Sequence, residues 1–210
     1  MSNESIHSPQ RDRERTTAAI LSAATELFLD RGFAAVPISL IAKQANVTKS
    51  LIHHYFGDKR SLWLAVKDAS VASYATQQKA VFSSIGTERD EGGVAASAAA
   101  YFLFLQKHPE IARMFALVSF DGEFESGITE RDLQTSGIAF VKSLQNSGAV
   151  RDDIGADMML AAFASLIEHW FISRERFAKL NDLEPGPSLD ARYFDVVLKI
   201  LNGGVQISKK

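Results

Sequence analysis

The sequence predicts an all-α protein in which a small N-terminal helical module joins a larger C-terminal helical bundle. Apolar residues recur at helical spacing along most of the chain, and no segment shows a sustained two-residue alternation bounded by hairpin turns. The 210 residues suffice for one large domain or two small ones, and a hydrophobic fraction of 46% is typical of a globular chain.

Residues 12–56 are expected to form three short helices. The first helix carries one apolar stripe at i, i+4, i+7 and i+8, formed by Ile20, Ala24, Leu27 and Phe28. Gly32 then ends this helix, because glycine adopts the conformation that a helix C-terminus requires. Pro37 fits the first turn of the second helix, where its missing N–H is not needed.

The third helix is expected to follow a tight turn and to end at Phe56. Asn46 tolerates the left-handed backbone of such a turn, and Thr48 is a good N-cap. Gly57 ends the helix, and Asp58 can cap the long helix that follows.

The remaining chain is helical by the same criterion. Helices are expected near 59–84, 94–106, 109–120, 129–147, 155–180 and 189–204. We therefore expect a flexible tail at 1–11, a helix-turn-helix domain at 12–58, and a helical domain for effector binding and dimerisation at 59–210.

Composition restricts the class of protein. The formal charge is −2 and the pI is near 6.2, so any nucleic-acid site must be local. Residues 1–66 hold eight Lys/Arg against six Asp/Glu, which places the positive charge in the N-terminal third. Absence of cysteine excludes disulfides and thiolate sites, and no signal peptide or membrane span is evident. We expect a cytoplasmic protein that has no membrane partner.

The polar stretch Asn46–Trp63 does not indicate metal binding or catalysis. His53 and His54 are adjacent and so point about 100° apart on a helix, whereas helical zinc pairs need i, i+3 or i, i+4 spacing. The sequence has no Gly-rich phosphate loop and no G-x-S-x-G. We expect no cofactor and no enzyme activity, although catalytic groups dispersed over a bundle leave no local pattern.

The same stretch fits a helix that enters the major groove of DNA. Ile52 and Phe56 can pack with Val47 in a small core, so the opposite face points outward. That face carries Thr48, Lys49, Ser50 and His53, with Leu51 at its edge. Lysine donates to guanine, serine pairs with several bases, and leucine contacts the thymine methyl. The alternative is an ordinary solvated helix face.

Residues Gly32 to Val66, GFAAVPISLIAKQANVTKSLIHHYFGDKRSLWLAV, resemble the DNA-binding domain of the TetR-type (tetracycline-repressor-like) regulators. The family pattern closes the first helix with a glycine and an aromatic and has Ile-Ala on the second helix. After a small-Val-Ser/Thr turn comes a short helix ending in Phe, and lysine and leucine open the fourth. The matching residues are Gly32-Phe33, Ile41-Ala42, Asn46-Val47-Thr48, Ile52-His53-His54-Tyr55-Phe56, Lys59 and Leu62.

The resemblance implies roles for individual residues. Lys49, Ser50 and Leu51 match base-contacting positions, Tyr55 and Lys59 match phosphate-contacting positions, and Ser39 matches a position that sometimes reaches a base. Three residues depart from the pattern: Pro37 replaces a Thr or Ser that contacts phosphate, His53 stands where tyrosine is common, and Asn46 replaces a turn glycine. Arg11, Arg13 and Arg15 match an arm that contacts the DNA backbone or minor groove, or they form a solvated helix start.

A homodimer is expected as well, because one short helix contacts too few bases for specificity and two copies can contact successive major grooves of a palindrome. The resemblance places the dimer interface on the last two long helices. The expected interface residues are Leu160, Phe163, Ala164, Ile167, Phe171, Arg174, Tyr193, Val196, Val197 and Ile200.

The resemblance also implies a small effector enclosed by the middle helices, and the aromatic content there favours a hydrophobic or aromatic one. The candidate lining residues, any of which could instead be ordinary core, are Tyr101, Phe102, Phe104, Met114, Phe115, Phe120, Phe140, Phe163, His169 and Trp170. The expected function is a transcriptional regulator, acting as a repressor that the effector releases from palindromic operator DNA. The alternative is a helical small-molecule-binding or carrier protein whose N-terminal module does not contact DNA bases.

Overall fold

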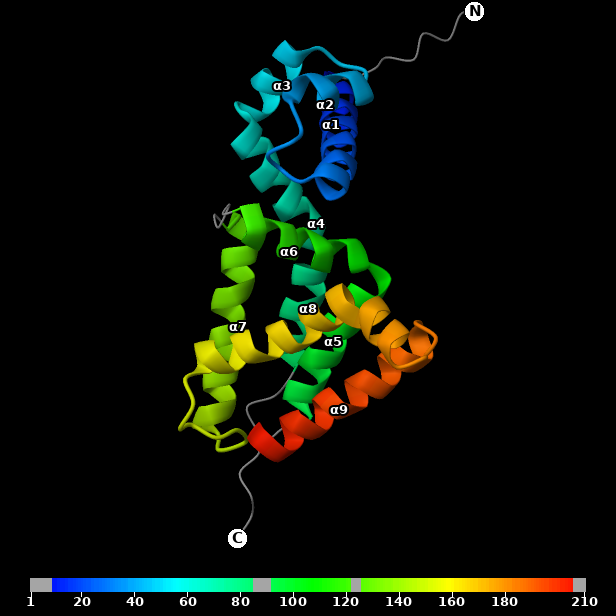
Figure 1. The fold of residues 1–210 in the computed structure, drawn as a ribbon. Coiled ribbons are helices and arrows are strands. Elements are labelled where there is room, and N and C mark those ends of the chain that lie inside the picture. Colours follow the sequence, from blue (N-terminus) through cyan, green and yellow to red (C-terminus); the bar gives the residue numbers. More distant parts are fainter. Residues whose placement is uncertain (1–8, 85–91, 122–125, 206–210) are drawn as a thin grey trace, which may run out of the picture. The chain divides into compact units, whose positions relative to one another are not determined.

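A computed structural model describes residues 9–84, 92–121 and 126–205, and it confirms the all-α prediction within them (Figure 1). The helices follow one another in the order that the sequence predicts. They are α1 (Pro9–Arg31), α2 (Ile38–Gln44), α3 (Lys49–Phe56), α4 (Lys59–Ser84), α5 (Gly93–Lys107), α6 (Pro109–Asp121), α7 (Ile128–Asn146), α8 (Ala156–Leu180) and α9 (Pro187–Val205).

The chain divides into two units. The first comprises residues 1–69 and 117–127, and the second comprises residues 70–116 and 128–210. The predicted domain boundary after residue 58 stays a prediction. Helix α1 begins at Pro9 and so includes the last residues of the expected tail, whose first eight residues lie outside the described part of the chain.

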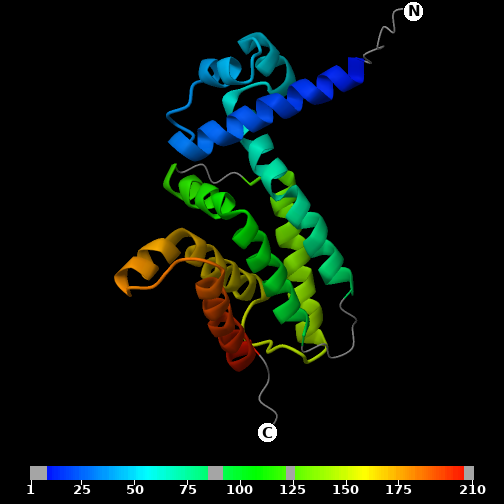
Figure 2. The same ribbon diagram turned by 90° about the vertical axis from the view of Figure 1, so that its right-hand side faces the viewer.

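The first unit has an apolar core formed by α1, α2, α3 and the start of α4. The long α1 lies beside α2 and α3 in Figure 2, and α1 packs on α2 as α2 packs on α3. Its fully buried side chains are Ile20, Phe28, Val36, Ile41, Ile52, Leu62 and Val66. Phe28 and Phe33 lie 5.0 and 6.0 Å from the Trp63 ring, measured between centroids. These aromatic contacts fix the start of α4 against the end of α1.

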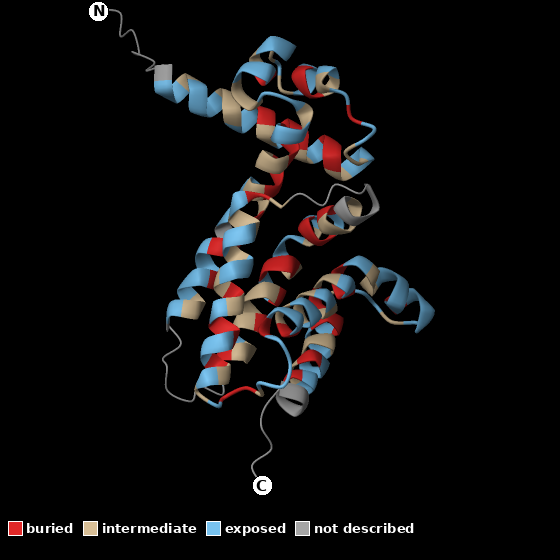
Figure 3. Ribbon diagram, turned by 90° about the vertical axis from the view of Figure 1, so that its left-hand side faces the viewer, coloured by how far each residue is buried: buried red, intermediate tan, exposed pale blue. Residues whose placement is uncertain are grey.

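The second unit is a helical bundle in which α5 packs on α8 and α9, and α7 packs on α8. The Phe102 ring of α5 lies 5.0 Å from Phe171 on α8 and 4.5 Å from Phe194 on α9, between centroids. Helices α7 and α8 approach closely at Gly137, where a Cβ atom would come within 2.9 Å of Leu160 Cδ2. Buried residues line the inward sides of the helices (Figure 3).

Two further features of the described residues concern membrane insertion and metal binding. No helix in the described ranges is long and apolar enough to span a membrane. Among the same residues, no group of three or more His, Cys, Asp or Glu side chains is arranged to hold a metal ion.

Candidate functional sites

Helix α3 is held at both ends by contacts that its sequence encodes. The backbone N–H of Leu51 donates to Thr48 Oγ1 at 3.3 Å, which confirms Thr48 as the N-cap. Gly57 ends the helix at φ 81°, and Asn46 adopts φ 53° in the turn before it. The short helix is therefore fixed at both ends by local contacts, one of which comes from Thr48 on its outward face.

One face of α3 is anchored and the other is exposed, as predicted. Ile52 is buried, whereas Val47 and Phe56 are half-buried. Thr48, Lys49, Ser50 and His53 are exposed and Leu51 is half-buried. The Thr48 and Ser50 hydroxyls lie 2.9 Å apart, so the first turn presents a hydroxyl pair beside a lysine.

The His53 ring has a fixed orientation. Its Nδ1 lies 2.6 Å from the carbonyl oxygen of Gly57. A carbonyl oxygen only accepts, so Nδ1 carries the proton and donates, which leaves Nε2 as an acceptor in the neutral ring. The neighbouring His54 is exposed and its ring lies 5.2 Å from that of Tyr55, between centroids.

The other residues that are expected to contact DNA lie around this face. Ser39 is exposed on α2, and Tyr55 is half-buried with the Arg13 guanidinium 5.8 Å from its ring centroid. Lys59 Nζ donates to the carbonyl of Ala34 at 3.3 Å and lies 4.4 Å from the Phe33 ring centroid. Arg13 thus joins the surface from within α1, whereas the sequence left open an arm ahead of the helix or a solvated helix start.

These features define an all-α protein that carries a helix-turn-helix. Residues 20–66 match the family model described as "Bacterial regulatory proteins, tetR family". The N-terminal part of the chain is thus similar to the DNA-binding part of TetR-type transcriptional regulators.

Curated relatives resemble the chain in this N-terminal part. The HTH-type transcriptional repressor Rv3405c of Mycobacterium tuberculosis (strain ATCC 25618 / H37Rv) is 48% identical over 56 residues, which are 27% of this chain and 30% of the relative. The HTH-type transcriptional regulator BetI of Rhizobium meliloti (strain 1021) is 35% identical over 72 residues, 34% of this chain and 36% of the relative. The match therefore spans about a third of the length of these relatives.

Solved structures resemble the fold over about nine tenths of the chain. A TetR family transcription regulator from Marinobacter aquaeolei VT8 aligns at a TM-score of 0.69 with 17% identity, over 91% of this chain and 97% of that one. FadR from Bacillus subtilis, solved in complex with stearoyl-CoA, aligns at 0.65 with 16% identity, over 89% and 98% of the two chains. At these identities the likeness concerns the fold.

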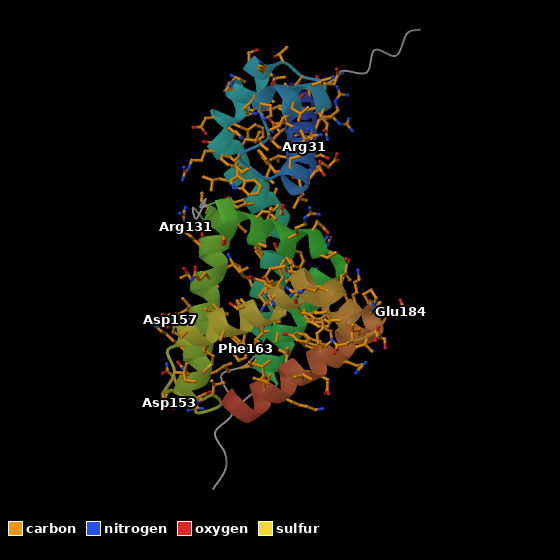
Figure 4. The ribbon with its side chains drawn as sticks, in the orientation of Figure 1. Arg31, Arg131, Asp153, Asp157, Phe163 and Glu184 are labelled. Carbon is orange, nitrogen blue, oxygen red and sulfur yellow. The ribbon has the colours of Figure 1, made fainter. Side chains whose placement is uncertain are left out.

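The predicted effector residues separate into different environments in the second unit. Phe102, Phe104, Met114, Phe140 and Trp170 are buried, Tyr101, Phe115 and Phe163 are half-buried, and His169 is exposed. Figure 4 labels Phe163 on α8. The side chain of Phe120 lies outside the described residues. Trp170 stacks on Tyr193 at 4.2 Å between ring centroids, so it belongs to the packing of α8 on α9.

Tyr101 and Phe104 belong to a cluster that the sequence did not reveal. The Tyr74 ring of α4 lies 5.0 Å from Tyr101 and 4.8 Å from Phe104, between centroids. The Tyr101 hydroxyl donates to the carboxylate of Glu168 on α8. We call Tyr74, Tyr101, Phe104 and Glu168 the tyrosine–carboxylate cluster.

Burial and like charge control the acid–base behaviour of this cluster. Burial raises the pKa of Glu168, the hydrogen bond from Tyr101 lowers it, and the negative charge of Glu130 raises it. Burial raises the pKa of Tyr74 and Tyr101, and the charge of Glu168 adds to both effects. A negative charge at Glu168 is thus felt by two aromatic side chains that pack around it.

The residues predicted for the dimer interface lie on two sides of α8 and α9. Ile167, Phe171 and Val197 are buried in the core of the chain itself. Leu160, Phe163, Ala164, Arg174 and Tyr193 are half-buried, and Val196 and Ile200 are exposed. Met158 and Ile172, which were not among the predicted interface residues, are also exposed on α8.

Proposed function

We propose that the chain is a TetR-type transcriptional regulator that binds palindromic operator DNA as a homodimer, represses transcription there, and is released by a small effector with a hydrophobic or aromatic body. The observation that carries the proposal is the exposed first turn of α3. Thr48, Lys49 and Ser50 stand free of the core, while Ile52 beneath them is buried. A capped helix N-terminus with a lysine and hydroxyls offers donors both to base edges and to phosphates.

Phosphate contacts would come from the surroundings of α3. Tyr55 with Arg13 beside it, and Lys59 at the start of α4, supply a hydroxyl and cations of the first unit. Such contacts orient a protein on the duplex without specifying its sequence. Specificity would therefore rest on Lys49, Ser50 and Leu51.

The dimer would form through the exposed face of α8 and α9. On α8, Met158, Ala162, Ser165, His169 and Ile172 follow one another at helical spacing, and all are exposed. Val196 and Ile200 add exposed apolar area from α9. Exposed large apolar side chains such as Met158, Ile172, Val196 and Ile200 are typical of an interaction surface. Two copies would place their α3 helices about 34–36 Å apart, one turn of DNA.

Effector binding would act by linkage. A ligand held in the second unit would favour an arrangement in which the two α3 helices no longer fit successive grooves, and DNA would weaken ligand binding by the same factor. A coupling of about 2–3 kcal/mol corresponds to a change of roughly 30- to 150-fold in operator affinity.

A selection of bound fragments from sheared genomic DNA tests the proposal. We expect a recovered palindrome, protection of both half-sites in a footprint, and an affinity that falls with salt at a log–log slope of about −0.9 for each neutralised phosphate. Recovery of no common sequence would overturn the operator function.

The carrier alternative has one supporting observation. Pro37 caps α2 without a side-chain hydrogen bond, and it cannot offer the hydroxyl that its family position supplies to phosphate. A carrier would bind its ligand with the same affinity whether or not duplex DNA is present. A regulator would show reciprocal weakening, so one ligand titration with and without the selected duplex separates the two functions.

A further inference from the structure

The tyrosine–carboxylate cluster brings aromatic faces and an acid together inside the second unit. Tyr74 comes from α4, Tyr101 and Phe104 come from α5, and Glu168 comes from α8. Tyr74 and Phe104 are buried, and their rings stack with an interplanar angle of 25°. The faces of aromatic rings carry negative potential, so they attract cations as a carboxylate does.

Two carboxylates act on the cluster. Glu130 on α7 is close enough to raise the pKa of both Tyr101 and Glu168. The Glu168 carboxylate accepts one hydrogen bond from Tyr101 through Oε1, whereas an ionised carboxylate offers about four acceptor positions. The Glu168 carboxylate can therefore accept further hydrogen bonds, and the negative charge of Glu130 acts at the same place.

A second acceptor lies along the same pair of helices. Gln78 follows Tyr74 by one turn on α4 and is 2% exposed. Its Nε2 donates to Ser97, one turn before Tyr101 on α5, while its Oε1 is buried with no hydrogen-bond partner. A buried amide oxygen without a donor costs about 1–3 kcal/mol, so a ligand that brings an N–H donor gains by pairing it.

We propose that the tyrosine–carboxylate cluster binds an organic ammonium cation whose N–H groups donate to Glu168 and Gln78 and whose apolar body packs on Tyr74, Tyr101 and Phe104. This inference rests on the proposed effector function and names the charge of the effector. An anionic ligand of the same shape would meet repulsion from Glu168 and Glu130 and would bring no donor for the two acceptors.

Three probes of one shape and different charge test the proposal on the full chain. They are 4-tert-butylbenzylamine, 4-tert-butylbenzyl alcohol and 4-tert-butylbenzoate, whose dissociation constants are measured by calorimetry at pH 7.5. We expect the amine to bind at least about tenfold more tightly than the alcohol, and the benzoate to bind most weakly, because hydrogen bonds to charged groups contribute about 1.5–3 kcal/mol. Equal binding of amine and alcohol, tighter binding of the benzoate, or no binding of any probe would overturn the proposal.

Variants locate the effect. Glu168→Gln should remove the preference for the amine over the alcohol, whereas Glu175→Gln, an exposed position two turns further along α8, should keep it. Tyr101→Phe retains the carboxylate and should keep most of the preference for the amine. This variant keeps the proposal testable if Glu168→Gln does not fold. Persistence of the preference in Glu168→Gln would also overturn the proposal.

Operator release is measured separately with the same probes. An amine that binds through Glu168 without weakening the complex with selected DNA would support the ligand class and contradict the proposed effector function. An amine that binds no better than the alcohol, while the alcohol releases DNA, would support the effector function and overturn the ligand class.

Discussion

The indole Nε1 of Trp170 donates to Oδ1 of Asp190 at 2.8 Å in the interior of the second unit. Arg174 and Gln106 donate to the other oxygen of the same carboxylate at 2.8 and 3.2 Å. One side chain of α9, itself 1% exposed, thereby bonds to two residues of α8 and one of α5. Both oxygens of this buried carboxylate accept hydrogen bonds, and removing it leaves three donors without that partner.

Asp190→Ala should therefore lower the free energy of unfolding by about 3–5 kcal/mol, since it leaves the Arg174 guanidinium without its buried partner. Asp190→Asn keeps acceptor oxygen and should cost less. Urea denaturation measures both, and Asp195→Asn is the matched control because its pair with Lys199 is exposed and worth at most about 0.5 kcal/mol. A loss no larger than that of the control would contradict a structural role for Asp190.

Glu168→Gln should stabilise the protein more at pH 7.5 than at pH 4. The pKa of Glu168 is raised in the folded state, so between the ordinary value near 4.3 and the raised value the folded chain binds more protons than the unfolded chain. Stability then falls as pH rises through that window. Glutamine does not ionise and avoids this loss. Thermal denaturation at the two pH values checks the sign, with the exposed Glu175→Gln variant as the matched control.

Lys49→Ala should weaken operator binding by about 1–3 kcal/mol and relax one base position if it contacts a guanine. Lys59→Ala should weaken all duplexes alike and reduce the salt slope by about 0.9. Fluorescence anisotropy on selected and scrambled duplexes distinguishes the two patterns. Because Lys59 also donates to Ala34, the melting temperature of that variant is measured alongside. Wild-type affinity in both variants would contradict the proposed roles of α3 and Lys59 in DNA binding.

Substitution of two isoleucines of α8 should affect different properties, the stability of the fold at Ile167 and dimer formation at Ile172. Ile167 is 1% exposed, so Ile167→Ala should lower the free energy of unfolding by about 2–5 kcal/mol. Ile172 is 48% exposed, so Ile172→Asp should leave each chain folded and weaken the dimer. Sedimentation velocity measures the association state, and circular dichroism measures the fold. An Ile172→Asp variant that still sediments as the wild type does would contradict the proposed interface.

The helices and the outward face of α3 could be predicted because each depends on local pattern. Apolar spacing defines the elements, and Thr48, Gly57 and Asn46 have conformational preferences that act within one turn. The N–H of Ser61 donates to Asp58 Oδ1 at 2.7 Å, so the cap of α4 was equally visible in the sequence. Exposure of Lys49 and His53 then follows from burial of Ile52.

The burial of individual residues on α8 could not be predicted in the same way. This helix is apolar on more than one side, so spacing alone does not say which side meets the rest of the chain. His169 and Trp170 are neighbours, yet His169 is exposed and Trp170 is buried against Asp190 from a helix 20 residues later. Glu168 gave no signal either, because its partner Tyr101 lies 67 residues away.

The small residues on the exposed face of α8 have a consequence for how two copies would meet. Between Met158 and Ser165 this face carries Ala161 and Ala162, so a second α8 laid across that stretch would approach the main chain closely. The axes of the two helices would then lie near the short end of the usual spacing of about 8–10 Å. A leucine in place of Ala162 would act as a wedge that forces the helices apart while leaving each subunit intact.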